Sequence, residues 1–257
     1  MYTCNHDTYT KHCLIVIPSF NEERNLPEFL PELQEIARQV NADILGIDDA
    51  SEDGTARVFK EHGIPCISHI THMGYGVALQ TCYKYALANN YDFLIQIDGD
   101  GQHDPRFIPK ILHMLKENEA DVLIGSRFLR HSETKFKPRG KLYYGTFLRR
   151  FGIQMFRGIL YLLTLRKFTD PTSGYVGINR RTLRFFSGKC FPFDYPDADL
   201  LLALLRNHFH VKEIPVYMYA NESNGNLHRG CRPIWYVIKV SLAMCIESIR
   251  LREERYG

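Results

Sequence analysis

Residues 94–105 read LIQIDGDGQHDP, an apolar run that ends in two acids spaced one residue apart. Such a run is typical of a buried strand, and charges at the end of a buried strand are costly unless something compensates them. Hard divalent cations such as Mg²⁺ and Mn²⁺ take one or two carboxylates together with substrate phosphates. Asp98 and Asp100, with Gln102 as a neutral oxygen, therefore indicate a cation site. The alternative is a solvated turn with an incidental acid pair.

The first half of the chain alternates strand-like and helix-like segments. Short apolar runs predict parallel strands that are buried on both faces, and amphipathic spacing between them predicts helices. The expected strands are 14–18, 43–49, 66–70, 93–98 and 121–127, and the expected helices are 26–40, 56–62, 77–90 and 106–118. This alternation predicts an α/β fold with a mostly parallel sheet flanked by helices.

Polar residues follow these strands directly. The clusters are 19–23, 48–51, 98–104 and 126–127. Ligands of parallel sheets bind outside the carboxyl ends of the strands. The sequence therefore predicts that the clusters form one site at one edge of the sheet.

The second half is less regular. It contains expected strands at 172–178 and 210–219 and expected helices at 198–208 and 233–252. Pro215 cannot donate a hydrogen bond to a neighbouring strand, so we expect 210–219 at the edge of the sheet.

Composition narrows the class of protein. The chain has 257 residues and a net charge of +3, which is too small to argue for a nucleic-acid partner. Seven cysteines without a CxxC pair favour a reducing compartment over a disulfide framework or a metal cluster. We see no signal-peptide pattern and no apolar run of about 18 residues, the length that would span a bilayer. We therefore expect a cytoplasmic protein that touches a membrane only at its surface.

Two motifs next to the first strands carry candidate ligand contacts. In IDDASEDGT (47–55), Asp49 can accept a hydrogen bond from a ribose hydroxyl or a base N–H, whereas Ser51 or Asp53 is explained as a helix cap. In VIPSFNEE (16–23), the two glutamates are equally well explained as first-turn acids of a helix.

Two further motifs are weak when taken alone. The loop HMGYGVA (72–78) precedes a helix and can offer backbone N–H groups to phosphate. In GSR (125–127), Arg127 can pair with phosphate.

Together, VIPSFNEE, IDDASEDGT, HMGYGVALQ, DGDGQHDP, GSRF and DPTSGY resemble in order and spacing the motifs of family 2 glycosyltransferases. Within that family the chain resembles the dolichyl- and polyprenyl-phosphate sugar synthases, over residues 13–220. The resemblance implies a GT-A fold, which is Rossmann-like, a donor that is a UDP- or GDP-linked sugar, and a divalent metal, Mg²⁺ or Mn²⁺.

The resemblance also implies roles for individual residues. Residues implied to bind the nucleotide-sugar are Pro18, Phe20, Glu22, Asp49, Gly74, Asp98, Gly99 and Arg127, and those implied to bind metal are Asp98, Asp100 and Gln102. Phe20 stands where the family usually has tyrosine, so stacking is kept and a hydroxyl is lost.

On the acceptor side the resemblance implies a second group. Its members are Asp170, Ser173, Gly174, His228 and Arg229. Asp100 and Asp170 are candidate catalytic residues. Asp197 and Asp199 lie where a general base for a hydroxyl acceptor usually lies, although acids are also favoured at a helix N-terminus. A phosphate acceptor is already anionic and needs no base.

One stretch departs from the lipid-phosphate branch. In NESNGNLHRG (221–230), Glu222 stands where that branch carries the arginine of a phosphate-gripping basic pair, and His228 or Arg229 must serve for the lysine of that pair.

Segments 135–167 and 232–256 are candidates for contact with a membrane surface. The first combines many cations with aromatic and apolar residues and contains no acid. It is either a packed helical pair with solvated cations or a surface drawn to anionic lipid headgroups. The second predicts an amphipathic helix. A membrane interface would explain such a helix, and core packing or a homodimer would explain it equally well.

The sequence therefore predicts a metal-dependent inverting glycosyltransferase of the cell envelope, acting on a polyprenyl phosphate or another lipid-linked acceptor at the inner face of the membrane. We expect an N-terminal tail (1–12), a GT-A domain (13–220, with a donor half 13–130 and an acceptor half 131–220) and a C-terminal loop and helix (221–257). Transfer to a saccharide hydroxyl by an Asp base is an alternative. A non-catalytic nucleotide-sugar-binding protein is another. A nucleotidyltransferase is disfavoured because VIPSFNEERN lacks a glycine-rich basic loop.

Overall fold

The computed structural model describes residues 12–130, 136–145, 147–188, 191, 198–220 and 232–249. Its strands are β1 (Cys13–Ser19), β2 (Ala42–Asp48), β3 (Cys66–Ser68), β4 (Phe93–Gln96), β5 (Val122–Ser126), β6 (Val176–Asn179) and β7 (Val211–Pro215). Its helices are α1 (Leu26–Val40), α2 (Thr55–Glu61), α3 (Tyr75–Ala88), α4 (Ile108–Lys116), α5 (Phe147–Thr164), α6 (Arg180–Phe186), α7 (Ala198–Arg206) and α8 (Arg232–Ile249), with a 3₁₀ turn η1 (Pro105–Phe107) before α4.

The described strands form one seven-stranded sheet in the order β3-β2-β1-β4-β6-β5-β7. Strand β6 runs antiparallel to both of its neighbours, β4 and β5, and the other pairings are parallel. The α/β class, the mostly parallel sheet and the edge position of the strand that contains Pro215 are confirmed.

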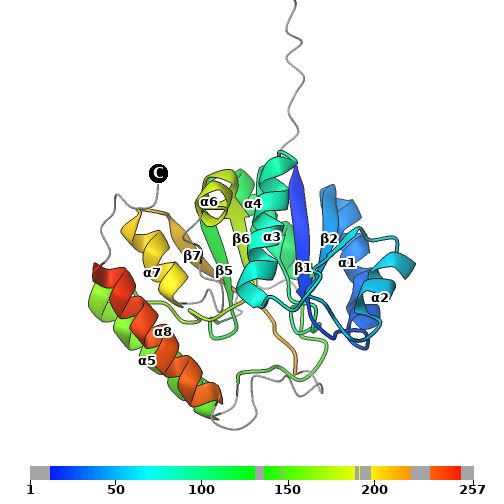
Figure 1. Ribbon diagram of the computed structural model, residues 1–257. Helices are drawn as coiled ribbons and strands as arrows, with labels where there is room; N and C mark the ends of the chain where they lie inside the picture. Colours follow the sequence, from blue (N-terminus) through cyan, green and yellow to red (C-terminus); the bar gives the residue numbers. More distant parts are fainter. Residues whose placement is uncertain are drawn as a thin grey trace, which may run out of the picture.

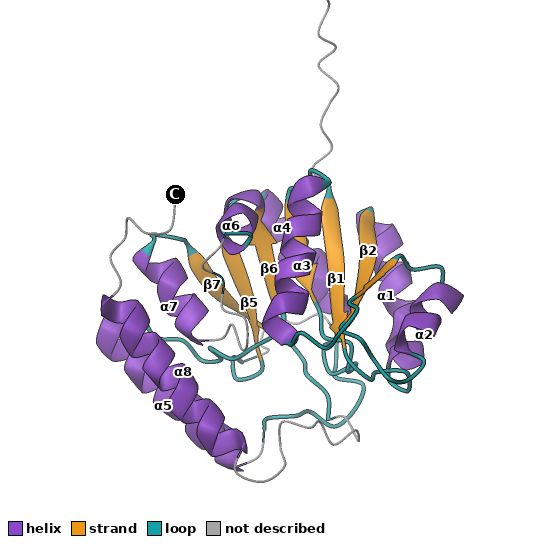
Figure 2. Cartoon of the chain, in the orientation of Figure 1, coloured by secondary structure: helices purple, strands orange, loops and turns teal. Residues whose placement is uncertain are grey.

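The helices cover both faces of the sheet, as Figures 1 and 2 show. Alternate residues of β1 point to opposite faces: Ile15 and Ile17 pack with α1, α2 and α4, whereas Leu14 and Val16 belong to the core that includes α3 and α5 to α8. Every residue of β1 is buried, as the continuous apolar run predicted.

Segment 135–167 does not form a helical pair by itself, which was one of the two alternatives for it. Its described part contains one helix, α5, and residues 136–145 form an extended loop with an isolated bridge between Leu142 and Tyr219. The partner of α5 is α8, and the two helices lie side by side at the left of Figure 1. Among the described residues, no helix combines the length and apolar character that a membrane crossing requires.

Candidate active site

Four strands bring their carboxyl ends to the same edge of the sheet. Strands β1, β2, β4 and β5 all point the same way, since β6 is antiparallel to both β4 and β5. Ser19 ends β1, Asp48 ends β2, Asp98 follows β4 and Arg127 follows β5. The predicted polar clusters therefore meet at this edge.

Asp98 and Asp100 occupy a partly enclosed position there. The Asp98 side chain is 26% exposed. Burial raises the pKa of both carboxyl groups, and the negative charge of Asp98 raises the pKa of Asp100 further. Backbone N–H of Gln102 donates to Oδ1 of Asp100 at 2.9 Å, which closes the loop. Two carboxyl groups that resist ionisation together form a site where added positive charge is favourable.

A chain of hydrogen bonds from the core holds the Asp98 carboxylate. The Tyr75 hydroxyl donates to Oδ1 of Asp98 at 2.7 Å and accepts from Nε2 of Gln96 at 2.8 Å. The Tyr83 hydroxyl donates to Oε1 of Gln96 at 3.0 Å. The sequence pattern predicts no role for these three residues. The available signal was Gln96, a buried amide within an otherwise apolar strand.

His103 is a second residue that supports Asp98, and the sequence pattern predicts no role for it. Its Nδ1 accepts from the backbone N–H of Asp98 at 3.2 Å, so the ring proton belongs on Nε2, which lies 3.7 Å from Oδ2 of Asp98. Burial lowers the pKa of His103 to about 4, which keeps the ring neutral near pH 7. The ring stacks on Tyr175 with centroids 5.0 Å apart.

Gly174 and Gly99 permit close approach at the same place. A β-carbon on Gly174 would lie 2.5 Å from Oδ2 of Asp98, and one on Gly99 would lie 2.3 Å from Oγ of Ser19. Ser173 shapes the turn before β6, since its hydroxyl accepts from the backbone N–H of Tyr175 at 3.2 Å.

Asp49 organises the loop between β3 and α3. Its carboxylate is 3% exposed and accepts from the backbone N–H groups of Met73 at 3.0 Å and Gly74 at 2.7 Å. The same carboxylate lies 2.6 Å from Nδ1 of His69 and 3.0 Å from Nδ1 of His72. Its predicted contact with a nucleobase stays a prediction, because these four groups already occupy its oxygens.

The surface next to Asp49 is aromatic. The ring of His72 lies 4.1 Å from that of Phe20 and tilted by 32°, and the His72 side chain is 55% exposed. These two rings, which come from different loops, offer a stacking surface for a planar group.

Glu22, in the loop after β1, is close enough to the acid pair to feel its charge. Burial raises its pKa to about 7, an Asn25 hydrogen bond opposes this, and the charges of Asp100 and Asp98 raise it further. Pro18 lies in β1, where its carbonyl accepts from the backbone N–H of Gly99 at 3.3 Å.

Arg127 and Asp170 form a buried ion pair on the opposite side of the acid pair. Nε of Arg127 lies 2.6 Å from Oδ2 of Asp170, and the side chains are 3% and 0% exposed. Glu213 accepts from the backbone N–H of Asp170 at 2.6 Å, and burial raises the pKa of Glu213. Nη1 of Arg127 has no hydrogen-bond partner within the described part of the chain. A buried, unpaired donor on a cation suits an anionic ligand.

Among the remaining predicted residues, the structure describes Asp199 alone. Asp199 lies in the first turn of α7, a position that the helix dipole also favours. Asp197, His228 and Arg229 lie outside the described residues. Over the described ranges, no group of three or more His, Cys, Asp or Glu side chains is arranged to hold a metal ion.

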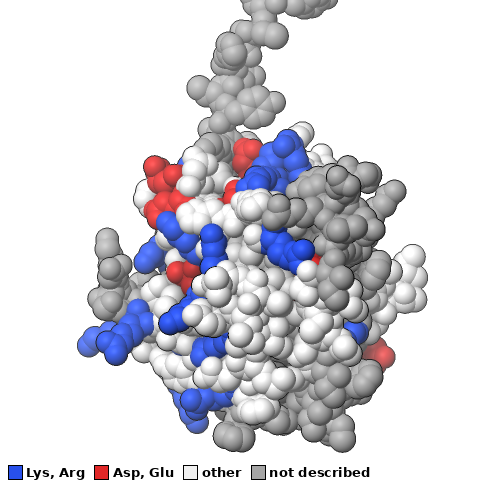
Figure 3. All heavy atoms as spheres, turned by 90° about the vertical axis from the view of Figure 1, so that its left-hand side faces the viewer, with Lys and Arg blue, Asp and Glu red and all other residues white. Residues whose placement is uncertain are grey.

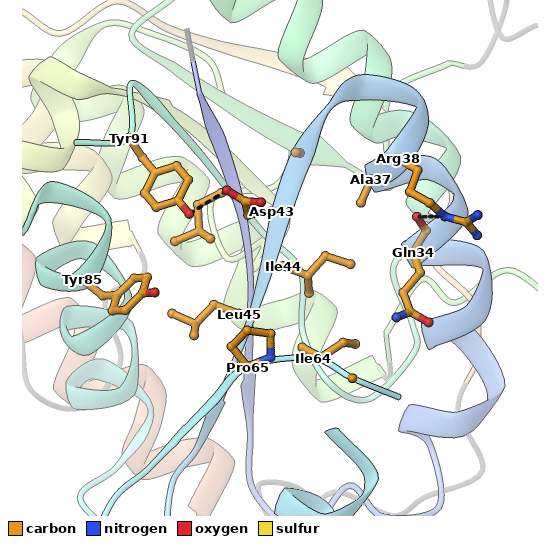
Figure 4. Close-up of a pocket in the computed structure, with 13 residues that line it drawn as sticks. Gln34, Ala37, Arg38, Asp43, Ile44, Leu45, Ile64, Pro65, Tyr85 and Tyr91 are labelled. Atoms are coloured by element: carbon orange, nitrogen blue, oxygen red, sulfur yellow. Dashed lines mark hydrogen bonds between the residues drawn. The ribbon is translucent and has the colours of Figure 1, made fainter. Parts of the chain in front are cut away.

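A separate pocket of about 440 Å³ lies at the other end of the sheet (Figure 4). It is lined by the first residues of β2, including Asp43 and Ile44, and by Tyr91, whose hydroxyl donates to Oδ2 of Asp43 at 2.7 Å. Because these residues begin the strand, the pocket is remote from the acid pair.

Comparisons with known proteins show the family of the chain. Residues 14–186 match the sequence model of Glycosyl transferase family 2. Polyprenol monophosphomannose synthase of Mycolicibacterium smegmatis is 28% identical over 227 residues, which cover 80% of this chain and 77% of that protein. Undecaprenyl-phosphate mannosyltransferase of Micrococcus luteus is 31% identical over 178 residues, which cover 66% and 68%.

The fold is also found among solved structures. Glucosyl-3-phosphoglycerate synthase from Mycobacterium tuberculosis, crystallised with Mn²⁺, uridine diphosphate and phosphoglyceric acid, has a TM-score of 0.67 to this chain. Sequence identity is 17%, and the match covers 95% of this chain and 81% of that one. This likeness shows a GT-A fold.

Proposed function

The chain belongs to glycosyl transferase family 2 and is a glycosyltransferase; from that premise we propose that it transfers a sugar from a nucleotide-diphosphate sugar to a polyprenyl phosphate or another lipid-linked acceptor. Transfer would be metal-dependent and would invert the anomeric carbon by in-line displacement. The observation that carries the proposal is the acid pair Asp98 and Asp100, flanked by Glu22 on one side and by the buried Arg127 on the other.

The donor set suits Mg²⁺ or Mn²⁺. Asp98, Asp100 and Gln102 supply hard oxygen atoms, and such cations commonly use one or two carboxylates and complete their shell with diphosphate oxygens and water. A site with fewer than three acidic ligands therefore fits a cation that arrives with its nucleotide. When bound, the cation neutralises charge on the departing diphosphate.

The loops next to the acid pair form the proposed donor pocket. Phe20 and His72 offer a stacking surface for the base, and Asp49 holds His72 and the backbone at Gly74 in place. Two hydrogen bonds fix Asp98: the Tyr75 hydroxyl donates to its carboxylate, and its own backbone N–H donates to Nδ1 of His103. The reacting centre then lies between the acid pair and Arg127.

Arg127 supports an anionic acceptor. Its Nε and Nη2 are engaged by Asp170 at 2.6 and 3.3 Å, which leaves Nη1 for a phosphate oxygen of donor or acceptor. Because Asp170 is fully buried in this pair, its geometry favours orienting Arg127 over acting as a base. A phosphate nucleophile needs no base, in keeping with the lipid-phosphate acceptors named for two relatives.

Helices α5 and α8 support a membrane-surface location. Large apolar side chains stand exposed on them: Phe151, Tyr161, Leu162, Leu163, Leu242 and Ile246. Exposed cations, including Arg150, Arg166 and Lys239, lie on or just beyond the same helices. Figure 3 shows this side of the molecule as a broad uncharged area with Lys and Arg around it and few acids. Such a surface fits the interface of an anionic bilayer.

The decisive experiment is a screen of UDP- and GDP-linked sugars with Mg²⁺ or Mn²⁺, with and without polyprenyl phosphate. We expect metal-dependent transfer that falls by about 100-fold or more in Asp100→Asn. Asp43→Asn, an exposed acid at the far end of the sheet, is the matched control and should keep full activity. No turnover of any nucleotide-sugar, or a fully active Asp100→Asn, would overturn the proposal. Transfer to a saccharide alone would redirect it to a hydroxyl acceptor.

A further inference from the structure

Asp104 is a buried acid that the proposed reaction does not use. Its side chain is 1% exposed, and Arg106 engages it as a fork, with Nε 2.8 Å from Oδ1 and Nη2 2.5 Å from Oδ2. The Tyr219 hydroxyl donates to Oδ2 at 2.6 Å. An acid at this position of the sequence is explained by a cap on the turn η1. Asp104 does cap that turn, since Oδ1 accepts from the backbone N–H of Arg106 at 3.0 Å. The other contacts exceed what a cap requires.

The Tyr219 hydroxyl is the point where three segments meet. It accepts from Nη2 of Arg106 at 2.9 Å and from the backbone N–H of Arg139 at 3.2 Å, besides donating to Asp104. The Arg106 guanidinium also lies 4.2 Å from the centre of the Phe136 ring. Side chains from the acid loop and from the chain beyond β7 are thus joined to the 136–145 loop.

Backbone pairing gives these three segments a fixed register. Backbone N–H of Tyr219 donates to the carbonyl of Gln102 at 2.8 Å, and that of Ala220 donates to Lys141 at 2.9 Å. Isolated bridges pair His103 with Met218 and Leu142 with Tyr219. Residues 217–220 therefore lie between the acid loop on one side and the 136–145 loop on the other.

Each segment leads to a different part of the proposed site. Gln102 is two residues from Asp100, residue 220 precedes the stretch that contains His228 and Arg229, and the 136–145 loop precedes α5. We propose that Asp104, Arg106 and Tyr219 are positioning residues that hold the acceptor-side segments in register with the metal-binding loop. The proposal rests on the proposed function, because it assigns a task within that reaction.

The arrangement predicts which step depends on this cluster. The donor-side groups Phe20, Glu22 and His72 belong to loops after β1 and β3, and none of the cluster's hydrogen bonds reaches them. Loosening the cluster should therefore leave nucleotide affinity intact and weaken use of the acceptor. A general loss of stability would lower both together.

The test compares Tyr219→Phe with Tyr91→Phe. Both remove a hydroxyl that donates to an aspartate, at 2.6 Å in Tyr219 and 2.7 Å in Tyr91, and Tyr91 lies at the far end of the sheet (Figure 4). For Tyr219→Phe we expect the KM for polyprenyl phosphate to rise about tenfold, the effect of losing one charge-assisted hydrogen bond. The ratio of donor hydrolysis to transfer should rise with it, while the Kd for nucleotide and metal stays within about twofold of wild type. Tyr91→Phe should change none of these.

Two further measurements keep the outcome decisive. Arg106→Lys keeps the charge and loses the fork, so it should behave as Tyr219→Phe does. Amide exchange of residues 139–143 should accelerate in Tyr219→Phe and stay unchanged in Tyr91→Phe. Equal acceptor KM in both tyrosine variants, or a Tyr219→Phe protein that is unfolded at assay temperature, would overturn the positioning role. A wild-type protein without transfer would instead overturn the proposed function.

Discussion

Gly174 and Asp98 approach each other so closely that a β-carbon on Gly174 would stand 2.5 Å from Oδ2 of Asp98. No real β-carbon tolerates that distance from an oxygen, so a larger residue must displace the carboxylate. The turn before β6, for which the resemblance implies an acceptor-side role, thereby defines the position of an acid that we propose binds the donor and its metal.

Replacement of Gly174 by alanine should therefore damage metal and nucleotide binding. The Tyr75 hydroxyl, 3.1 Å from the same β-carbon position, blocks the carboxylate from moving aside. We expect Gly174→Ala to weaken Mn²⁺-dependent nucleotide affinity at least tenfold, as measured by calorimetry. Gly158→Ala is the control, since nothing lies within 4 Å of its β-carbon position and alanine favours a helix. Equal affinity in the two variants would contradict the steric argument.

The buried pair of Arg127 and Asp170 should contribute strongly to stability. Asp170→Asn leaves the buried guanidinium without its counter-charge, which typically costs about 3–5 kcal/mol. Urea unfolding measures the loss. Glu119→Gln, which breaks an exposed pair with Lys212, is the control and should cost less than about 1 kcal/mol. A stable but inactive Asp170→Asn would instead point to a direct catalytic task for this acid.

Glu22 should make the stability of the ligand-free protein depend on pH. Its pKa rises from an ordinary 4.5 to about 7 in the folded state, so the folded protein holds this proton more tightly than the unfolded chain does. The resulting stability is complete below about pH 4.5 and is lost as pH rises through about 7.

Glu22→Gln removes this titration. Between pH 5 and pH 8 the variant should lose about 1 kcal/mol less stability than wild type, after allowance for the partial exposure of the side chain. Unfolding curves at the two pH values give the comparison. Identical pH profiles for both proteins would show that Glu22 is already ionised in the fold.

The apolar face of α5 and α8 should bind vesicles that contain anionic lipid. Leu162 is 79% exposed on this face, and Leu162→Glu removes apolar contact while adding a repelled charge. We expect vesicle affinity to fall about tenfold or more in sedimentation assays. Ile70→Glu is the control, because Ile70 is 99% exposed but lies in the loop after β3. Equal losses in both variants would mean that the face has no special role.

The strands were predictable because their signals are local. Runs such as LIVIP and FLIQ are apolar throughout, and parallel strands covered on both faces require that pattern. The acid pair was predictable for the same reason, since charges that interrupt such a run stand out. Helix α6, in contrast, was missed: it has only seven residues and three arginines, and its identity depends on packing of Leu183 and Phe186 against the sheet.

The supporting residues of the site were not predictable from short motifs. Tyr75 reaches Asp98 across 23 positions, and Tyr219 reaches Asp104 across 115. Nothing in the local sequence around either tyrosine distinguishes a hydroxyl that orients an acid from one that faces water. The left-handed backbone of Ala50, with φ of 58°, was likewise not predictable from its sequence.

The place of β6 in the sheet bears on how the chain folds during synthesis. Strands β4 and β5 leave the ribosome first, yet neither has its shared neighbour until Val176–Asn179 has been made. Until then both present open edges, which are prone to pair with the wrong partner, and the long-range closure that follows is slow. Gly174 reaches Asp98 only at that closure. The nascent chain therefore completes the contact between the turn at Gly174 and the Asp98 carboxylate only late in synthesis, and a chain stalled before β6 would expose two strand edges that are prone to aggregation.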